Sequence, residues 1–300
     1  MDESQSNAVR ADAFRILAAS HVRIEPPFAP EARGLVEQTD LLADCIGVQV
    51  RRTWDACGRE GDDFVLSSTV MSSQISGNVA MSTRLFDGIE RRCGRRPLAI
   101  MDSYMCTGWG FALRMFANRT GVRSATVVIA DVDVEDLQFR RGHRPIGHMS
   151  FGITVAVVGM PTQRPDAATC DGPFSGSAFN DLVWAMKKQR AQWQPDLTLM
   201  PFVREEMDAV ARRVIGADGM LPNRFPEYGH CFGSDTWISV THHLIDSPAQ
   251  GSQSMLMGAI AFNGYYTICK MLTDQETRVS FDTLDAGLPA ILSYLAGRNA

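Results

Sequence analysis

Residues 97–116 (PLAIMDSYMCTGWGFALRMF) constrain the fold most, because they combine a strand, a turn and a helix around one cysteine. The apolar run Leu98–Met101 is typical of a buried strand, and it breaks at Asp102. Cys106 follows, just before apolar residues at helical spacing. Unpaired backbone N–H groups and the dipole at a helix start favour a thiolate. The segment predicts either a nucleophilic cysteine at a strand-to-helix turn or a small buried residue that fills the turn.

Strand-like and helix-like segments alternate along the chain, which predicts the α/β class. In the first part, strands are expected at 13–24, 64–71, 97–105, 125–132 and 151–160, and helices at 32–57, 79–92 and 107–118. Residues 161–174 are rich in Pro, Asp, Gly and Thr, which indicates a linker or crossover. The alternation then resumes with helices at 179–192, 203–214, 236–245 and 288–296, and strands at 197–201, 255–262 and 265–271. Asn263-Gly264 between the last two strands is typical of a hairpin turn. We therefore expect two tandem βαβαβ-type halves, residues 1–165 and 166–300.

Composition excludes several classes of protein. The net charge of −5 argues against nucleic acid as the main partner. The seven cysteines are an odd number without a CxxC pair, a pattern typical of reduced intracellular thiols. The N-terminal residues are polar and acidic, unlike a secretory signal, and no stretch approaches the roughly 18 apolar residues that a membrane span needs. We expect a soluble cytoplasmic protein with no nucleic-acid or membrane partner.

Four segments in the right order resemble the thiolase superfamily, and most closely its beta-ketoacyl-ACP synthase III branch. Residues 13–27 resemble the opening strand of that branch, and residues 102–113 resemble its acyl-accepting segment, with Cys106 at the nucleophile position. Residues 228–235 (YGHCFGSD) resemble the segment that usually contains Gly-Asn, and residues 255–271 resemble the closing glycine-rich hairpin. The resemblance covers most of the chain. It implies a thiolase-like fold, in which the two halves form a layered α-β-α-β-α core.

The departures from the family pattern concern the active site. The family's catalytic histidine follows the short strand of the second half, and Phe202 occupies that position here. His230 stands where the family has its active-site asparagine. The chain is also short after its first strand, where the family has a segment that helps to hold coenzyme A.

The resemblance implies that Cys106 accepts an acyl group as a thioester. His230 would act as a base, first on Cys106 and then on the acceptor nucleophile. Alternatively, His230 is a structural histidine that caps a turn. Asp235 either orients His230 or caps the helix that follows it.

Further groups complete the expected site. Backbone amides near Cys106 and in the hairpin from Gly258 to Gly264 are expected to stabilise the oxyanion, although this hairpin has fewer glycines than the family's version. Phe202 and Trp109 are expected either to form apolar walls of the acyl pocket or to be core residues without a role in the reaction. Because Phe202 replaces the family's His and His230 replaces its Asn, we expect weak or absent malonyl decarboxylation. The predicted activity is acyl transfer to an oxygen, nitrogen, sulfur or activated carbon nucleophile, in polyketide-like, fatty-acid-like or specialised metabolism.

No cofactor or metal is expected, since Cys231 beside His230 is followed by no second ligand pair at usable spacing. The acyl donor is expected as a substrate, carried by an acyl carrier protein or by coenzyme A. Three basic doublets either meet the carrier or form a solvated face: Arg91-Arg92, Arg95-Arg96 and Arg140-Arg141. A dimer is expected, as in the superfamily, either with a second copy or with a paralogue.

The same departures also fit a different class of protein. A catalytically inactive, ketosynthase-like partner subunit would complete a heterodimer with an active paralogue and would need no intact site. Retention of Cys106 beside a helix start, with His230 in the segment expected to face it, favours the enzyme. A serine or cysteine hydrolase would need a nucleophile elbow such as GxSxG, which the sequence lacks.

Overall fold

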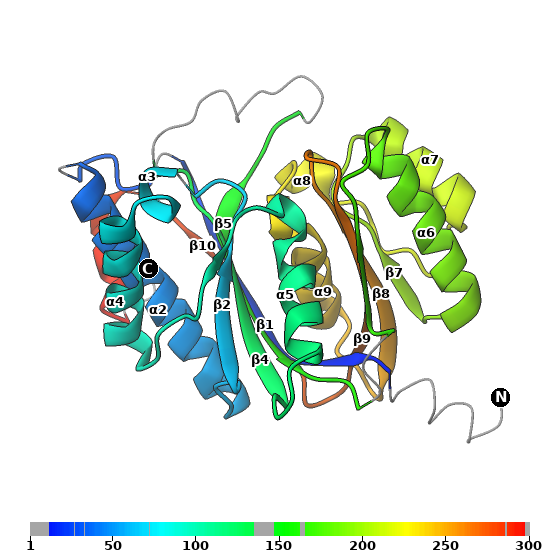
Figure 1. Cartoon of the computed structure of the whole chain (residues 1–300), viewed down its shortest axis with the longest axis horizontal. Coiled ribbons are helices and arrows are strands. Elements are labelled where there is room, and N and C mark those ends of the chain that lie inside the picture. The colour runs from blue at the N-terminus through cyan, green and yellow to red at the C-terminus, as the bar shows by residue number, and fades with distance from the viewer. Residues whose placement is uncertain are drawn as a thin grey trace.

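The computed structural model describes residues 12–26, 28–32, 34–71, 73–134, 147–162, 166–285 and 287–297. Strands and helices form five layers, helix–sheet–helix–sheet–helix, which follow one another from left to right in Figure 1. The predicted α/β class and its α-β-α-β-α layering are therefore confirmed.

The first sheet contains β1 (Phe14–Ile24), β2 (Asp63–Ser67), β3 (Ile100–Met101), β4 (Ser124–Asp131) and β5 (Phe151–Gly159). Its order is β3-β2-β4-β5-β1, and β5 runs antiparallel to both neighbours while the other pairs are parallel. β4 and β5 are almost wholly buried and apolar, because helices cover both faces of the sheet. The strand expected at 97–105 is reduced to Ile100 and Met101, after which the chain turns toward Cys106.

The second sheet contains β6 (Ala168–Asp171), β7 (Leu197–Leu199), β8 (Gln253–Ile260) and β9 (Tyr266–Thr273). Its order, β7-β8-β9-β6, repeats the parallel, antiparallel, antiparallel pairing of β2-β4-β5-β1. The expected hairpin is confirmed as β8 and β9. The linker expected at 161–174 is wrong in part, because it contains β6, which pairs with β9.

Helices fill the other three layers. Beside the first sheet lie α2 (Leu35–Cys57), α4 (Val79–Cys93) and the single turn α3 (Ser73–Ser76). The middle layer contains α5 (Gly108–Ala117) and α9 (Asp235–Asp246), and the far layer contains α6 (Ala178–Trp193) and α7 (Glu205–Ile215). The single turn α8 is Phe225–Tyr228. Within the described part of the chain, none of the helices combines the length and apolarity needed to cross a membrane.

The end of the chain returns to the first sheet. β10 (Arg278–Leu284), which the sequence analysis did not predict, pairs in parallel with β1. The final helix, α10 (Leu288–Leu295), packs against α2, where the Tyr294 hydroxyl donates to Gln49 at 2.5 Å. β1 also pairs with β9 at Phe14 and Arg15, so it joins the two sheets. The division between residues 165 and 166 stays a prediction.

Two glycines let α5 fit between the sheets. α5 contacts β2 and β4 on one side and β6 and β9 on the other. A Cβ at Gly108 would overlap the side chain of Ser67 in β2, and a Cβ at Gly110 would overlap Thr267 in β9. The Gly-Trp-Gly sequence after Cys106 is therefore explained by close packing at both faces of one helix.

Candidate active site

Cys106 lies in a 3₁₀ turn, η1 (Met105–Thr107), between the end of β3 and the start of α5. Met105 adopts a φ of 48°, a conformation that costs free energy for a residue with a side chain. The Cys106 side chain is buried, with 1% exposed. The structure thus places the cysteine at the expected strand-to-helix turn, at the positive end of the α5 dipole.

His230 faces the cysteine. Its Nε2 lies 3.7 Å from Cys106 Sγ, within the range for a hydrogen bond to sulfur. The backbone of His230 is fixed on both sides, because its amide donates to the His148 carbonyl and its carbonyl accepts from the Ser150 amide. The expectation that this segment faces Cys106 therefore agrees with the geometry.

Asp235 contacts the imidazole. Its Oδ2 accepts a hydrogen bond from His230 Nδ1 at 2.8 Å, so Nε2 is the ring nitrogen directed at the cysteine. The same carboxylate accepts the backbone N–H groups of Cys231 at 2.6 Å and Phe202 at 3.0 Å. Asp235 is the first residue of α9, and the described residues include no capping bond from the side chain at the α9 N-cap. The Asp235 carboxylate therefore contacts the imidazole and two backbone amides, and its orienting role stays a prediction.

Electrostatics favour a protonated His230. Burial alone would lower the pKa of His230, but the Asp235 carboxylate and the Cys106 thiol outweigh it and raise the pKa well above its usual value. A cationic imidazole 3.7 Å from sulfur is a suitable partner for a thiolate. The three side chains form a buried Cys-His-Asp chain, the arrangement that activates nucleophiles in many unrelated folds.

A cavity of about 90 Å³ adjoins the imidazole of His230. Phe202 lies in its wall, as expected, together with Arg204 and Phe262. Most of the lining is apolar, and a water molecule in the liquid occupies roughly 30 Å³, so this cavity accommodates a small group. The other expected wall residue, Trp109, lies elsewhere: it is fully buried and packs edge-to-face on Trp237 at 5.4 Å.

The two glycines that bound the expected oxyanion hairpin contact groups outside the site. A Cβ at Gly258 would approach Met186 of α6, so this residue faces the far helix layer. The amide of Gly264 donates to the Ala261 carbonyl within the hairpin turn. The turn itself does reach the site, because Phe262 lines the cavity and the Asn263 side chain donates to the Ser103 carbonyl at 2.8 Å. The expectation for the amides of the hairpin from Gly258 to Gly264 stays a prediction, and the turn between these glycines is the part that reaches the cavity.

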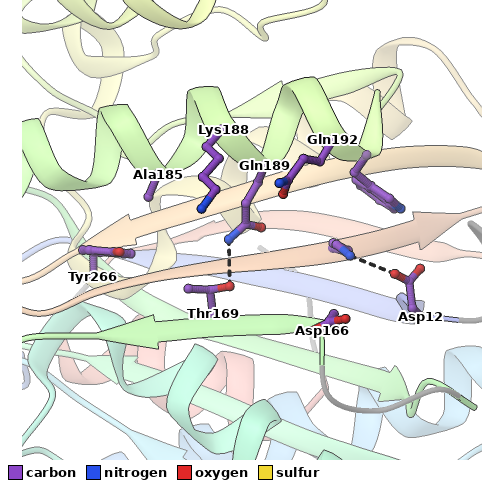
Figure 2. Close-up of a pocket in the computed structure, with 10 residues that line it drawn as sticks. Asp12, Asp166, Thr169, Ala185, Lys188, Gln189, Gln192 and Tyr266 are labelled. Carbon is purple, nitrogen blue, oxygen red and sulfur yellow. Dashed lines mark hydrogen bonds and ion pairs between the residues drawn. The ribbon is translucent and has the colours of Figure 1, made fainter.

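A larger cavity in the described residues lies elsewhere. It measures about 630 Å³ and lies between α6 and the strands β6 and β9. Figure 2 shows Lys188 and Gln189 directed from α6 toward the strands, with Gln189 hydrogen-bonded to Thr169. Lys270 in this cavity forms an ion pair with Asp12 at 2.8 Å. None of its lining residues is a cysteine or histidine, whereas the smaller cavity has His230 in its lining.

The basic doublets make structural contacts where they are described. Arg92 and Arg96 form exposed ion pairs with carboxylates of α2 and α4, respectively. Arg95 donates to two backbone carbonyls. Arg140 and Arg141 lie outside the described residues. In the described part of the chain, no group of three or more His, Cys, Asp or Glu side chains is placed to hold a metal ion.

Two contacts of Cys106 and its neighbours escaped the sequence analysis. The Thr69 hydroxyl donates to Cys106 Sγ at 3.4 Å. Asp131, the last residue of β4, is buried beneath the site and accepts hydrogen bonds from Thr69 and Gly233. An acidic residue at the end of an otherwise apolar strand was the available signal for Asp131, whereas nothing local distinguishes Thr69.

Comparison with known proteins gives a result at the level of structure. No family model matches the sequence, and no curated protein matches it. Several solved structures match over nearly their whole length. The 3-oxoacyl-(acyl carrier protein) synthase III, FabH, of Pseudomonas aeruginosa PAO1 is 12% identical and aligns with a TM-score of 0.60, covering 87% of this chain and 98% of that one.

The chain has a thiolase-like fold of the ketoacyl-ACP synthase III type. The priming beta-ketosynthase of the R1128 polyketide pathway shares this thiolase-like fold, with 15% identity, a TM-score of 0.61 and coverage of 88% and 97%. ChlB3, described as an acyltransferase, aligns at 16% identity and a TM-score of 0.63, covering 88% of this chain and 99% of that one. The thiolase-like fold is thus common to structures described as condensing enzymes and to one described as an acyltransferase.

Proposed function

We propose that this chain is an acyltransferase that holds its acyl group as a thioester on Cys106 and passes it to an acceptor nucleophile. The observation that carries the proposal is the connected chain of Cys106, His230 and Asp235, with an Sγ to Nε2 distance of 3.7 Å and an Nδ1 to Oδ2 distance of 2.8 Å. A protein that needed only the shape of a synthase would have no requirement for this buried arrangement.

In the first half-reaction, the Cys106 thiolate attacks the carbonyl carbon of the donor thioester. A carbon–sulfur bond to Cys106 forms, and the bond to the donor sulfur breaks when the tetrahedral intermediate collapses. The departing donor thiolate takes the proton from the His230 imidazolium. The products are acyl-Cys106, a neutral imidazole and the free donor thiol.

In the second half-reaction, the neutral imidazole is the base. The thioester sulfur carries no charge, so the part of the pKa increase at His230 that came from Cys106 is lost. His230 Nε2 accepts the proton of the acceptor as its oxygen or nitrogen attacks the acyl carbon. Collapse of this second intermediate releases the product and restores the thiolate beside a protonated His230, with Asp235 stabilising the cation.

We propose that backbone N–H groups stabilise both tetrahedral intermediates. The amides of Thr107 and Gly108 are already bonded to the carbonyls of Tyr104 and Met105, so the donor that we propose on this side is the amide of Cys106, for which the described residues show no hydrogen bond. In the turn from Ala261 to Tyr265, the amides of Phe262 and Asn263 make no hydrogen bond to any residue that the structure describes. They are the hairpin donors that we propose in place of Gly258 and Gly264.

The site is poorly suited to malonyl decarboxylation. The Phe202 ring lies in the wall beside His230 and offers no hydrogen-bond donor to a developing enolate. His230 is already engaged by Asp235 and Cys106. We therefore propose that a malonyl group is transferred intact. The small cavity favours short acyl groups, and the donor is an acyl carrier protein or coenzyme A.

Intact-protein mass spectrometry tests this proposal. The purified chain is mixed with acyl thioesters on coenzyme A and on carrier protein, and the added mass is mapped by peptide digestion. We expect one acyl group on Cys106, none on Cys106→Ala, and an unchanged result for Cys57→Ala, which removes a thiol far from the site in sequence. With malonyl donors, the adduct should retain the carboxyl group.

Two outcomes would contradict the proposal. Acylation of another cysteine would remove Cys106 as the nucleophile. No adduct from any donor, together with tight co-purification with a ketosynthase-like paralogue, would favour the inactive partner subunit. If the chain forms a dimer with itself and becomes acylated, the partner-subunit alternative fails.

A further inference from the structure

Asp131 is a buried carboxylate that the Cys-His-Asp chain does not use. It ends β4 and is 1% exposed. Burial raises the pKa of this carboxyl, and backbone donors from Thr69, Gly233 and Val70 counteract the increase. An unpaired charge at this depth would be strongly destabilising, so the Asp131 carboxylate needs the hydrogen bonds that it accepts.

All of these hydrogen bonds come from two segments that adjoin Cys106. One carboxylate oxygen accepts from the Thr69 amide at 2.5 Å, the Val70 amide at 3.3 Å and the Ser68 hydroxyl at 3.2 Å, all in the loop after β2. The other oxygen accepts from the Gly233 amide at 3.2 Å, in the 3₁₀ turn η3 (Phe232–Ser234). One side chain therefore connects two loops that are far apart in sequence.

Both loops touch the nucleophile. The Thr69 hydroxyl donates to Cys106 Sγ at 3.4 Å. Gly233 lies against the backbone of Cys106, because a Cβ placed on it would be 3.3 Å from the Cys106 carbonyl oxygen. Displacement of the Asp131 carboxylate would thus move both Thr69, which contacts the sulfur, and Gly233, which contacts the Cys106 backbone.

We propose that Thr69 is a second hydrogen-bond donor to the Cys106 thiolate and that Asp131 is the positioning residue that holds it there. This inference rests on the proposed role of Cys106 as the nucleophile. A hydrogen bond to the charged form of a group favours that form. The hydroxyl stabilises the resting thiolate, loses most of this interaction when the sulfur becomes a neutral thioester, and regains it when the sulfur leaves in the second half-reaction.

Three titratable groups act on the sulfur, one directly and two through another residue. His230 approaches from the segment before η3, Asp235 acts through His230 from the start of α9, and Asp131 acts through Thr69 from the end of β4. His230 and Asp235 are unchanged in any Thr69 variant. A change in thiolate formation in such a variant therefore reports on the hydroxyl.

Alkylation of Cys106 by iodoacetamide, measured across pH and mapped by mass spectrometry, tests the proposal without an acyl substrate. In Thr69→Val, which keeps the size and branching of the side chain, we expect alkylation near neutral pH to be about tenfold slower and its midpoint to move to higher pH. Thr69→Ser keeps the hydroxyl and should restore most of the rate. Thr198→Val is the matched control, because its buried hydroxyl has no partner among the described residues and lies on β7.

Asp131→Asn tests the positioning role. The amide donates where the carboxylate only accepts, so it opposes the Thr69 or the Gly233 amide, and alkylation should slow at least as much as in Thr69→Val. Wild-type alkylation kinetics in Thr69→Val at every pH would overturn the proposal. Equal slowing in Thr69→Ser and Thr69→Val would also overturn it, because Thr69→Ser keeps the hydroxyl and the slowing would then not report on its loss. Absence of acyl-Cys106 in the wild type would instead defeat the proposed function and leave the alkylation results intact.

Discussion

Asp235→Asn separates the role of the carboxylate's charge from its shape. In the native protein, Asp235 accepts from His230 Nδ1 at 2.8 Å and from the backbone amides of Cys231 and Phe202. Asparagine has the same size but only one acceptor oxygen. If its NH₂ group faces His230, the imidazole proton moves to Nε2, and this nitrogen then cannot accept a proton from Cys106 or from the acceptor.

The magnitude follows from the distance. Two unit charges about 4 Å apart attract by about 4 kcal/mol at an effective dielectric constant of about 20, and the 2.8 Å hydrogen bond between His230 and Asp235 places their charges in this range. Since about 1.4 kcal/mol corresponds to a factor of ten, complete loss of this attraction disfavours the imidazolium by roughly 1000-fold. The remaining amide oxygen recovers part of it. We expect the rate of acyl-Cys106 formation to fall about 100- to 1000-fold.

The assay is single-turnover acylation followed by quenched mass spectrometry, with Cys106 alkylation across pH as a second measurement. Asp246→Asn is the matched control, because it makes the same substitution at the exposed last residue of the same helix, α9. Thermal unfolding of both variants establishes that each is folded at the assay temperature. A folded Asp235→Asn variant that acylates within threefold of the wild-type rate would refute the reasoning, because the carboxylate's charge would then be irrelevant to His230.

Three further predictions concern stability and its pH dependence. Gly110→Val should lower the free energy of unfolding by about 1–3 kcal/mol in a denaturant titration, because the new side chain overlaps Thr267. Tyr294→Phe should lower it by about 1–2 kcal/mol, since it leaves Gln49 without the donated hydroxyl that anchors α10. The pKa of His230 is raised in the folded state, so its contribution to stability is complete below about pH 6.5 and is lost as pH rises through the folded value. In His230→Gln, the free energy of unfolding should therefore fall less than in the wild type as pH rises above 6.5. An unchanged pH profile would contradict this prediction.

The order of strands and helices was predictable wherever burial imposes a period on the sequence. β4 and β5 are continuous apolar runs because both of their faces are covered. The four residues of β6 lie between turn-forming residues, a pattern that predicts a linker. Only their pairing with β9 makes them a strand. β10 was missed because most of its residues are exposed, and it exists through its pairing with β1 at the sheet edge.

Residues of the candidate site were likewise predictable only where a local sequence pattern marks them. Cys106 and His230 were visible because each stands beside a glycine-containing turn that precedes a helix. The orienting role of Asp235 depended on a distance, and sequence reasoning left it open. The expectation for the amides from Gly258 to Gly264 stays a prediction, because a Cβ at Gly258 would face α6 but this direction does not decide where a backbone N–H points. Thr69 reaches Cys106 across 37 positions, which no local pattern reports.

The fold's internal repetition explains why the site forms where it does. α5 precedes β4 and α9 precedes β8, the equivalent strands of the two sheets, and each helix follows a 3₁₀ turn. Both turns are strained: Met105 has a φ of 48° and Phe232 a φ of 55°. Such conformations cost on the order of 1–3 kcal/mol each. The strain at Phe232 cannot be attributed to exposure of a nucleophile, because that turn carries none.

The strained 3₁₀ turn instead occurs once in each half of the fold, and the two turns, η1 and η3, are in contact. The first turn carries Cys106 and the second is flanked by His230 and Asp235, so contact between the turns brings the segments that begin α5 and α9 together. Each helix dipole favours negative charge at its N-terminus, as does the proton on His230. In the proposed reaction, the thiolate of Cys106 and the oxyanion of each tetrahedral intermediate would form at this point, and His230 and Asp235 would add direction and proton transfer.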